Sequence, residues 1–208
     1  MSKVILVTGA SYGLGEVLLK RFSNRKDYKV AGIARTIKEE ENENILLFKG
    51  DITCKKDVDL FFKAVADKWG GFDILINNAG IVGDFKEIEK YSEEEIDALI
   101  NVNIKAAFMV SQKAVQLINK PGYIINIGST RSITGAPNKS LYTMSKFALR
   151  GLTQSINSEL KSKGIYSTIV CPGSFKTVPL DAIAGIIENL ISLDISAHVP
   201  EVIIGGML

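Results

Sequence analysis

Short apolar runs rich in β-branched residues alternate along this chain with longer segments of helical periodicity. The runs lie at residues 4–7, 29–33, 45–48, 72–76, 123–127, 165–170 and 202–204. Strands that are apolar along their whole length and separated by helices predict a parallel sheet covered on both faces. We therefore expect one doubly wound α/β domain over residues 1–208, with about seven parallel strands.

Composition excludes several functional classes. The chain has 208 residues, 46% of them hydrophobic, which is enough to bury one full core. A formal net charge of +2 gives no reason to expect nucleic acid or an anionic membrane as partner. Cys54 and Cys171 form neither a disulfide framework nor a metal-ligand cluster, so we expect a cytoplasmic protein without a metal. We also expect no membrane span and no signal peptide, and a solvated loop at the acidic residues 38–44.

The first expected strand runs directly into "TGASYGLG", which places Gly9, Gly13 and Gly15 before a helical segment. Glycines allow a sharp turn and a close approach of the backbone to a pyrophosphate, and the helix N-terminus offers unpaired N–H groups. The position between strand and helix favours a dinucleotide site over a structural turn. We expect the rest of this turn to line the site as well, namely Ser11, Tyr12 and Leu14.

One position after the second expected strand selects between the two nicotinamide cofactors. In dinucleotide folds, an acid about 20 residues beyond the glycines binds the ribose 2′-hydroxyl of NAD. Here Arg35 stands at that position, followed by Thr36. Because an arginine can bind a 2′-phosphate bidentately, NADP(H) is the expected cofactor and NAD(H) stays possible. The alternative is an exposed arginine at a strand end with no ligand.

The segment "YTMSK" places Tyr142 and Lys146 four positions apart, on one face of an expected helix. A phenol titrates near pKa ~10, and we expect the neighbouring ammonium to lower that value and make Tyr142 an acid or base. A serine hydrolase is disfavoured, because the chain has one histidine, His198, and no G-x-S-x-G turn. Cys171 is expected to be a small buried residue.

Together, the motifs "TGASYGLG", "GDIT", "NNAG", "NVN", "INIGST", "YTMSK" and "CPGSFKT" resemble the short-chain dehydrogenase/reductase family of the non-extended type. They follow the family order over residues 4–177. The resemblance implies one NAD(P)-binding Rossmann-fold domain. It also implies an oxidoreductase that transfers hydride between nicotinamide and a small-molecule carbonyl or alcohol substrate.

The same resemblance implies a catalytic tetrad of Asn103, Ser129, Tyr142 and Lys146. Tyr142 would exchange a proton with the substrate oxygen, and Ser129 would donate a hydrogen bond to it. Lys146 would hold the nicotinamide ribose, and Asn103 would position a water that relays protons. Further cofactor contacts carried over from the family are Asp51, Ile52, Asn78, Ala79, Gly80, Pro172, Gly173 and Thr177.

The chain departs from the family pattern after Thr177, where family members usually insert a helical lobe over the substrate. Here residues 178–190 resemble the next core helix and residues 201–208 the last strand, so we expect the lobe to be absent. The substrate pocket would then be open unless a neighbouring subunit covers it, and the resemblance implies a homodimer or homotetramer. A non-catalytic NADP-binding module that senses redox state or binds a partner is the alternative, although it would not require Ser129 or Tyr142.

Overall fold

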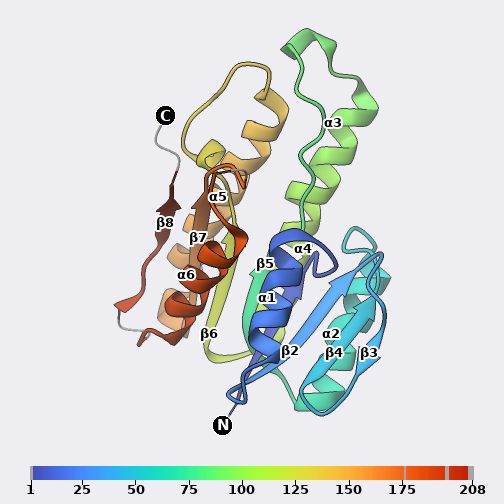
Figure 1. Ribbon diagram of the computed structural model, residues 1–208, viewed down its shortest axis with the longest axis vertical. Coiled ribbons are helices and arrows are strands. Elements are labelled where there is room, and N and C mark those ends of the chain that lie inside the picture. The colour runs from blue at the N-terminus through green and yellow to red at the C-terminus, as the bar shows by residue number, and fades with distance from the viewer. Residues whose placement is uncertain (1, 176, 195–196, 206–208) are drawn as a thin grey trace.

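Within residues 2–175, 177–194 and 197–205, which the computed structural model describes, eight strands form one sheet (Figure 1). The strands are β1 (Lys3–Thr8), β2 (Tyr28–Ala34), β3 (Glu40–Glu41), β4 (Ile45–Lys49), β5 (Phe72–Asn77), β6 (Ile118–Ile127), β7 (Ile165–Pro172) and β8 (Glu201–Ile204). Their order in the sheet is β3-β4-β2-β1-β5-β6-β7-β8. All pairs are parallel except β3 with β4.

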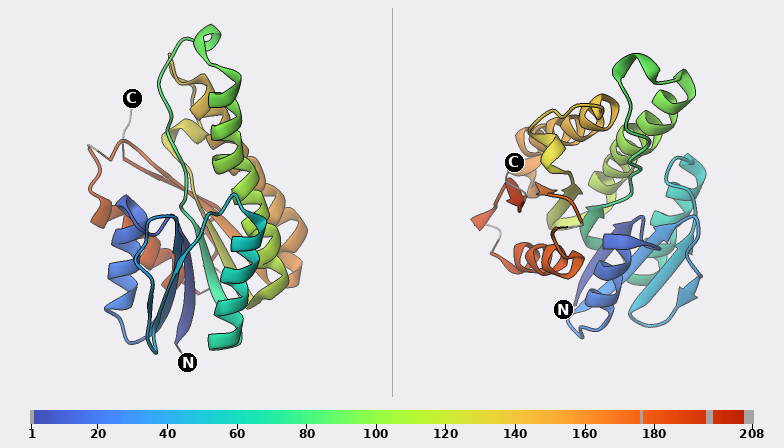
Figure 2. Two further views of the ribbon diagram at one scale, coloured as in Figure 1. Left: turned by 90° about the vertical axis from the view of Figure 1, so that its right-hand side faces the viewer. Right: turned by 45° about the horizontal axis from the view of Figure 1, so that its top comes forward.

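Helices cover both faces of this sheet (Figure 2). The longer ones are α1 (Gly13–Ser23), α2 (Lys55–Trp69), α3 (Glu93–Ile100), α4 (Ala107–Leu117), α5 (Ser140–Leu160) and α6 (Leu180–Ser192). Short helical turns lie at η1 (Ile88–Lys90), η3 (Thr130–Ser132) and η4 (Lys161–Lys163), and a π-helical segment, η2 (Asn101–Ala106), joins α3 to α4. Helices α1 and α6 pack on one face, and α2, α4 and α5 on the other. No helix of the described ranges has the length and apolar character that a membrane crossing requires.

The strands are apolar throughout because each face of the sheet has its own core. Successive side chains of a strand point to opposite faces. In β1, Ile5 and Val7 therefore join the core under α1 and α6, while Val4 and Leu6 join the core under α2 and α4. The expected parallel, doubly covered sheet is confirmed.

All seven expected strands are present, but the sheet has one more at its edge. Glu40 and Glu41 form the antiparallel strand β3 inside the acidic segment that we expected to be a loop. Both glutamates are exposed, so the segment has no apolar alternation that would reveal a strand. The strand pairs through its backbone, with Glu41 opposite Leu46.

The strand order positions the site. β2 and β5 lie on opposite sides of β1, so the loops after β1 and β5 diverge at the carboxyl edge of the sheet. α3 and the loops before α3 and α5 extend beyond that edge (Figure 1). α6 begins at Leu180, shortly after β7 ends at Pro172, and its buried residues belong to the core. The connection after β7, where we expected the lobe to be absent, is therefore short.

Candidate active site

The turn after β1 is shaped by two glycines whose backbone lies in the left-handed region. Gly9 has φ +67° and Gly13 has φ +59°. A Cβ on Gly9 would stand 2.8 Å from the Cα of Ala79, and one on Gly15 would stand 2.2 Å from the carbonyl oxygen of Gly9. Gly9 and Gly15 therefore permit close backbone packing between the β1 turn, α1 and the loop after β5.

The N-terminus of α1 is open to an anionic ligand. Its capping residue, Tyr12, gives no side-chain hydrogen bond to the first turn, so that turn's N–H groups have no side-chain cap. A Cβ on Gly13 would meet nothing within 4 Å, which leaves free space beside these donors. Uncapped N–H groups and the positive end of the helix dipole, with room beside them, fit a pyrophosphate.

A cavity of about 650 Å³ runs from this turn along the carboxyl edge of the sheet. Most of the cofactor contacts expected from the sequence line it, namely Gly9, Ser11, Tyr12, Gly13, Leu14, Arg35, Thr36, Asp51, Ile52, Asn78, Ala79, Gly80, Tyr142 and Lys146. Gly15, Asn103, Ser129, Pro172, Gly173 and Thr177 do not. We call this cavity the cofactor cleft. Part of its wall is apolar and is formed by side chains such as Val82, Val102 and Phe175, which were not expected from the sequence.

At one end of the cofactor cleft, three residues from two turns form a polar corner. The hydroxyls of Ser11 and Thr36 lie 3.0 Å apart, and Arg35 is exposed beside them, directly after β2. Among the described residues, Arg35 forms no ion pair. This corner combines an exposed cation with two hydroxyl donors, which is a suitable set for a phosphate group.

Asp51 is held by its own turn after β4. Its Oδ1 accepts hydrogen bonds from the Thr53 backbone N–H at 2.9 Å and from the Thr53 hydroxyl at 2.8 Å. The Asp51 N–H donates to Asp57 at 2.8 Å. The carboxylate is thus fixed in the cleft wall next to Ile52.

The loop after β5 is tied to the turn after β1 by Thr8 and Asn78. The Thr8 hydroxyl accepts from the backbone N–H groups of Asn78 and Ala79, both at 3.1 Å. The Asn78 side chain donates to the carbonyl oxygens of Thr8 at 3.0 Å and Gly9 at 3.2 Å. These bonds hold the floor of the cleft at the point where β1 and β5 meet.

Tyr142 and Lys146 lie one turn apart on α5, as the sequence predicted. Lys146 is 6% exposed, and its Nζ donates a 2.9 Å hydrogen bond to the carbonyl oxygen of Ile127. The ammonium lies 5.7 Å from the centre of the Tyr142 ring. Burial lowers the pKa of Lys146 from 10.5 to about 8, because desolvation penalises the charged form.

The expectation that Lys146 lowers the pKa of the phenol is wrong in this structure. Burial raises the pKa of Tyr142 above 10, and the hydrogen-bonding Ser129 side chain and the charge of Arg131 only partly oppose it. Lys146 makes no resolved contribution, because its ammonium is directed to Ile127 and is itself desolvated. Arg131 was not anticipated from the sequence, since its effect depends on how the loop after β6 folds.

Asn103 lies in the π-helical segment and is 1% exposed. Its side chain accepts from the Ile81 N–H and donates to the Ile81 carbonyl, both at 2.8 Å, and donates to Ser145 at 3.1 Å. A Cβ on Gly80 would stand 3.3 Å from Asn103 Oδ1 and 3.7 Å from Lys146 Nζ. Asn103 therefore fixes the loop after β5 close to Lys146, as π-helical insertions often do at functional sites.

Ser129 caps the turn η3 after β6. Its hydroxyl accepts from the Arg131 N–H at 3.2 Å, and its own N–H donates to the Ser132 hydroxyl at 3.2 Å. Ser132 is fully buried, whereas Ser129 is only half-buried. This local network sets the Ser129 side chain at the Tyr142 phenol.

In the segment after β7, the residues expected to contact the cofactor, Pro172, Gly173 and Thr177, do not line the cleft. Gly173 donates its N–H to the Ile204 carbonyl at 2.9 Å, and Thr177 donates from N–H and hydroxyl to the Ser174 carbonyl at 2.9 and 3.0 Å. Pro172 ends β7. From this segment, Phe175 lines the cleft instead, and 54% of its surface is exposed.

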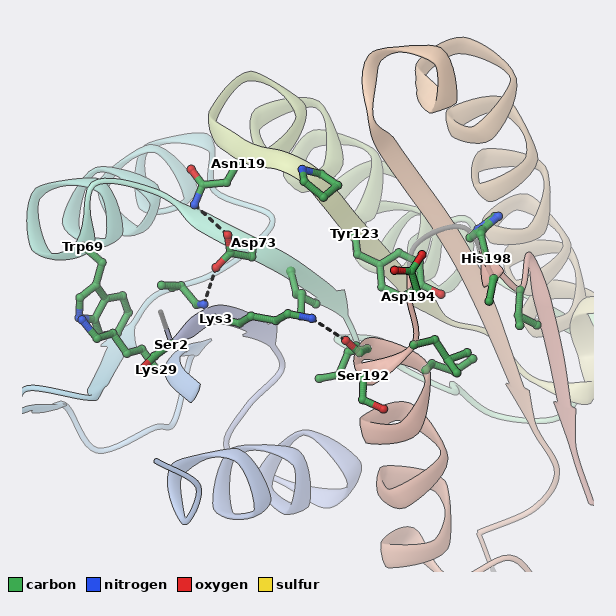
Figure 3. Close-up of a pocket in the computed structure, with 18 residues that line it drawn as sticks. Ser2, Lys3, Lys29, Trp69, Asp73, Asn119, Tyr123, Ser192, Asp194 and His198 are labelled. Atoms are coloured by element: carbon green, nitrogen blue, oxygen red, sulfur yellow. Dashed lines mark hydrogen bonds between the residues drawn. The ribbon is translucent and has the colours of Figure 1, made fainter. Parts of the chain in front are cut away.

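A larger cavity, of about 900 Å³, lies at the opposite edge of the sheet (Figure 3). Several of its polar groups are engaged by the protein: Lys3 donates to the Ile191 carbonyl, and Asp73 accepts from Asn119 and from the Val4 N–H. It contains none of the expected site residues. We therefore place the candidate active site at the cofactor cleft.

Cys171 is buried as expected, and neither it nor His198 lines the cofactor cleft. Cys171 is completely buried, and burial raises the pKa of its thiol. His198 contacts the Ser167 carbonyl at 2.9 Å and packs against the rings of Tyr123 and Tyr166, remote from the cofactor cleft.

Comparison with known proteins gives consistent matches. The family model described as short chain dehydrogenase matches residues 3–184. An uncharacterized oxidoreductase of Thermotoga maritima is 36% identical over 192 residues, which cover 86% of this chain and 74% of that protein. L-2,3-butanediol dehydrogenase of Corynebacterium glutamicum is 35% identical over 186 residues, 83% of this chain and 72% of that protein. A solved short-chain dehydrogenase/reductase of Serratia marcescens superposes with a TM-score of 0.87 at 27% identity, covering 97% of this chain and 95% of its own.

Proposed function

Because the chain belongs to the short-chain dehydrogenase family of oxidoreductases, which use NAD(P)(H), we propose that it is an NADP(H)-dependent enzyme that interconverts a carbonyl and an alcohol. The observation that carries the proposal is the meeting of Ser129, Tyr142 and Lys146 at the cofactor cleft, which also contains Gly13 at the open N-terminus of α1. Binding the cofactor alone would not require Ser129 or the Tyr142 hydroxyl.

A nicotinamide dinucleotide in the cofactor cleft would supply the hydride. The pyrophosphate would be held at Gly13 and the first turn of α1, and the adenine end at Asp51 and Ile52. Lys146, buried beside Gly80, would bind the ribose hydroxyls next to the nicotinamide. Pro172, Gly173 and Thr177 do not line the cleft, so we assign the nicotinamide end to Tyr142, Lys146 and Phe175 instead.

Tyr142 would act on the substrate oxygen. Its raised pKa keeps the phenol protonated at neutral pH, so it can donate a proton as the carbonyl is reduced. The Ser129 hydroxyl would donate a hydrogen bond to the same oxygen, where negative charge develops. Asn103 would hold the loop after β5 in place and, through the second lone pair of its Oδ1, accept from a water near Lys146.

Cofactor choice follows from the polar corner at the end of the cleft. Arg35, Ser11 and Thr36 would contact the 2′-phosphate of NADP(H), with the arginine supplying the charge. A carboxylate at this position would favour NAD(H) instead. NAD(H) would bind in the same cleft with the loss of this one interaction.

The protein would work as a homodimer or homotetramer that packs α5 against its mate. Large apolar side chains are exposed along α4 and α5, with Phe108 55% and Phe147 42% exposed. Such a pair of helices can bury these side chains against a second copy. The two cysteines are free, which agrees with a cytoplasmic location.

A non-catalytic NADP-binding module is the second candidate. The short connection after β7 favours it, because Phe175 stays exposed beside the cleft and is available to a partner protein. The test compares NADPH oxidation across a panel of aldehydes and ketones with NADPH binding in the same preparation. Turnover of any panel member above the enzyme-free rate supports the oxidoreductase. Tight binding without turnover of any of them supports the module.

A further inference from the structure

The segment that builds the substrate side of the site has an unusual charge distribution. Residues 98–158 contain seven basic side chains and neither aspartate nor glutamate. Lys113 pairs with Asp59 at 2.8 Å, and Arg150 pairs with Glu201 at 2.6 Å. Nearer the site, Arg131 and Lys139 form no ion pair with any carboxylate of the described ranges.

Arg131 is fixed beside the catalytic tyrosine. Its Nη1 donates a 2.7 Å hydrogen bond to the Gly135 carbonyl, and its backbone N–H donates to the Ser129 hydroxyl. The side chain does not line the cofactor cleft, yet its charge reaches the Tyr142 phenol. Arg131 therefore lies outside the cofactor cleft but close enough for its charge to act on Tyr142, whose hydroxyl the substrate oxygen would contact. Its other guanidinium N–H donors have no partner among the described residues.

Lys139 is fixed on the other side of the same loop. Its Nζ lies 4.4 Å from the centre of the Phe85 ring, which belongs to the loop after β5. The Tyr91 hydroxyl joins these two loops, because it contacts the carbonyl oxygens of Asp84 at 3.1 Å and Asn138 at 3.4 Å. Two cations are thus held in place by contacts that leave their charge unneutralised.

We propose that the substrate is a short oxo acid or hydroxy acid whose carboxylate is bound by Arg131, with Lys139 contributing long-range attraction. This inference rests on the proposed function and names its substrate class. The short connection after β7 leaves little surface to bury a ligand, so a charge-assisted contact is the strongest anchor that the loop offers. The carboxylate is unchanged in the reaction: the carbonyl carbon gains a hydride and its oxygen gains the Tyr142 proton.

The test uses substrate pairs in which one member carries an anionic group that the other lacks. Acetoacetate is compared with methyl acetoacetate, and hydroxyacetone phosphate with hydroxyacetone, by kcat/KM for NADPH-dependent reduction. Four variants accompany the parent protein: Arg131→Gln, Arg131→Lys, Lys139→Gln, and the remote exposed Lys163→Gln as a charge-matched control. The ratio of acid to ester separates a carboxylate contact from any effect of Arg131 on the Tyr142 pKa, because the latter acts on both substrates.

We expect the parent protein to prefer acetoacetate over its ester at least tenfold. Arg131→Gln should lower that ratio at least tenfold, Arg131→Lys and Lys139→Gln less, and Lys163→Gln not at all. A preference for the ester, or an equal fall for acid and ester in Arg131→Gln, overturns the inference while leaving the oxidoreductase intact. A preference for hydroxyacetone phosphate over acetoacetate assigns the site to phosphate and also overturns it.

If neither these pairs nor any member of the aldehyde and ketone panel is turned over, the proposed function fails and binding decides the inference. The midpoint of thermal unfolding is then measured with saturating NADP+ and increasing acetoacetate or its ester. Stabilisation by acetoacetate that is absent in Arg131→Gln supports the carboxylate site. No stabilisation, or the same stabilisation in both proteins, overturns it.

Discussion

The Lys146 ammonium lies 5.7 Å from the centre of the Tyr142 ring and donates its hydrogen bond to the Ile127 carbonyl, not to the phenol. Both groups are desolvated, so their pKa values move toward each other: that of Tyr142 rises and that of Lys146 falls to about 8. In this arrangement the phenol is a proton donor at neutral pH. The lysine is poised to donate to ribose hydroxyls in place of the Ile127 carbonyl.

The first prediction concerns the cost of burying Lys146. Below pH 8 the lysine is charged in folded and unfolded protein alike, and its burial opposes folding. Between about 8 and 10.5 it is neutral only in the folded protein, so stability should rise with pH in that window. Lys146→Met should therefore stabilise the cofactor-free protein at pH 7 by up to about 3 kcal/mol, less the cost of the lost bond to Ile127.

Urea unfolding of both proteins at pH 7 and pH 10 checks this prediction. The gain in unfolding free energy from Lys146→Met should be smaller at pH 10 than at pH 7. The variant should bind NADPH more weakly than the parent protein at both pH values. A difference in stability that does not change with pH would show that the lysine is not desolvated as the structure indicates.

The second prediction concerns Arg35. If its guanidinium binds the 2′-phosphate, NADPH should bind more tightly than NADH by about ten- to a hundredfold, because a charge-assisted contact contributes roughly 1.5–3 kcal/mol. Arg35→Asp should reverse the order, since a carboxylate repels the phosphate and accepts from a 2′-hydroxyl. Fluorescence titrations with NADPH and NADH measure the two affinities, with Arg25→Gln as a control far from the cleft. Equal affinities in the parent protein would remove the basis for NADP.

The third prediction concerns the space beside Gly13. Its φ of +59° is unfavourable for every residue but glycine, and asparagine tolerates it best among the others. A Cβ at this position would meet no protein atom within 4 Å. Gly13→Asn should therefore cost only about 1 kcal/mol of stability but occupy the place of the pyrophosphate and abolish binding of both cofactors. Thermal unfolding and NADPH titration are run side by side. Unchanged affinity in the folded variant would place the pyrophosphate elsewhere.

The sheet could be predicted because its strands carry their signal in local composition. Ile5, Leu6 and Val7 are all buried, and such a run is compatible with few structures besides a strand covered on both faces. β3 could not be predicted, because Glu40 and Glu41 are exposed and their pairing depends on the position of β4. Backbone pairing without side-chain burial leaves no pattern in the sequence.

The candidate site likewise has features that could be predicted from the sequence and features that could not. Spacing alone placed Tyr142 and Lys146 on one helical face, since that relationship is local. The predicted direction of the Tyr142 pKa shift was wrong, because burial raises this pKa more than Ser129 and Arg131, which come from another loop, lower it. Phe175 was passed over for the same reason: only the path of the chain after β7 brings it to the cleft.

In the proposed mechanism, Tyr142 exchanges a proton with the substrate oxygen. The most direct test compares the steady-state rate of NADPH oxidation by the parent protein and by Tyr142→Phe, with one substrate from the carbonyl panel, beside an NADPH titration of each. The phenylalanine keeps the ring and its packing but lacks the hydroxyl. We expect a fall in turnover of about 10²- to 10⁴-fold with NADPH affinity near the parent value. Full turnover by Tyr142→Phe would contradict it, and the tyrosine would then be a packing residue.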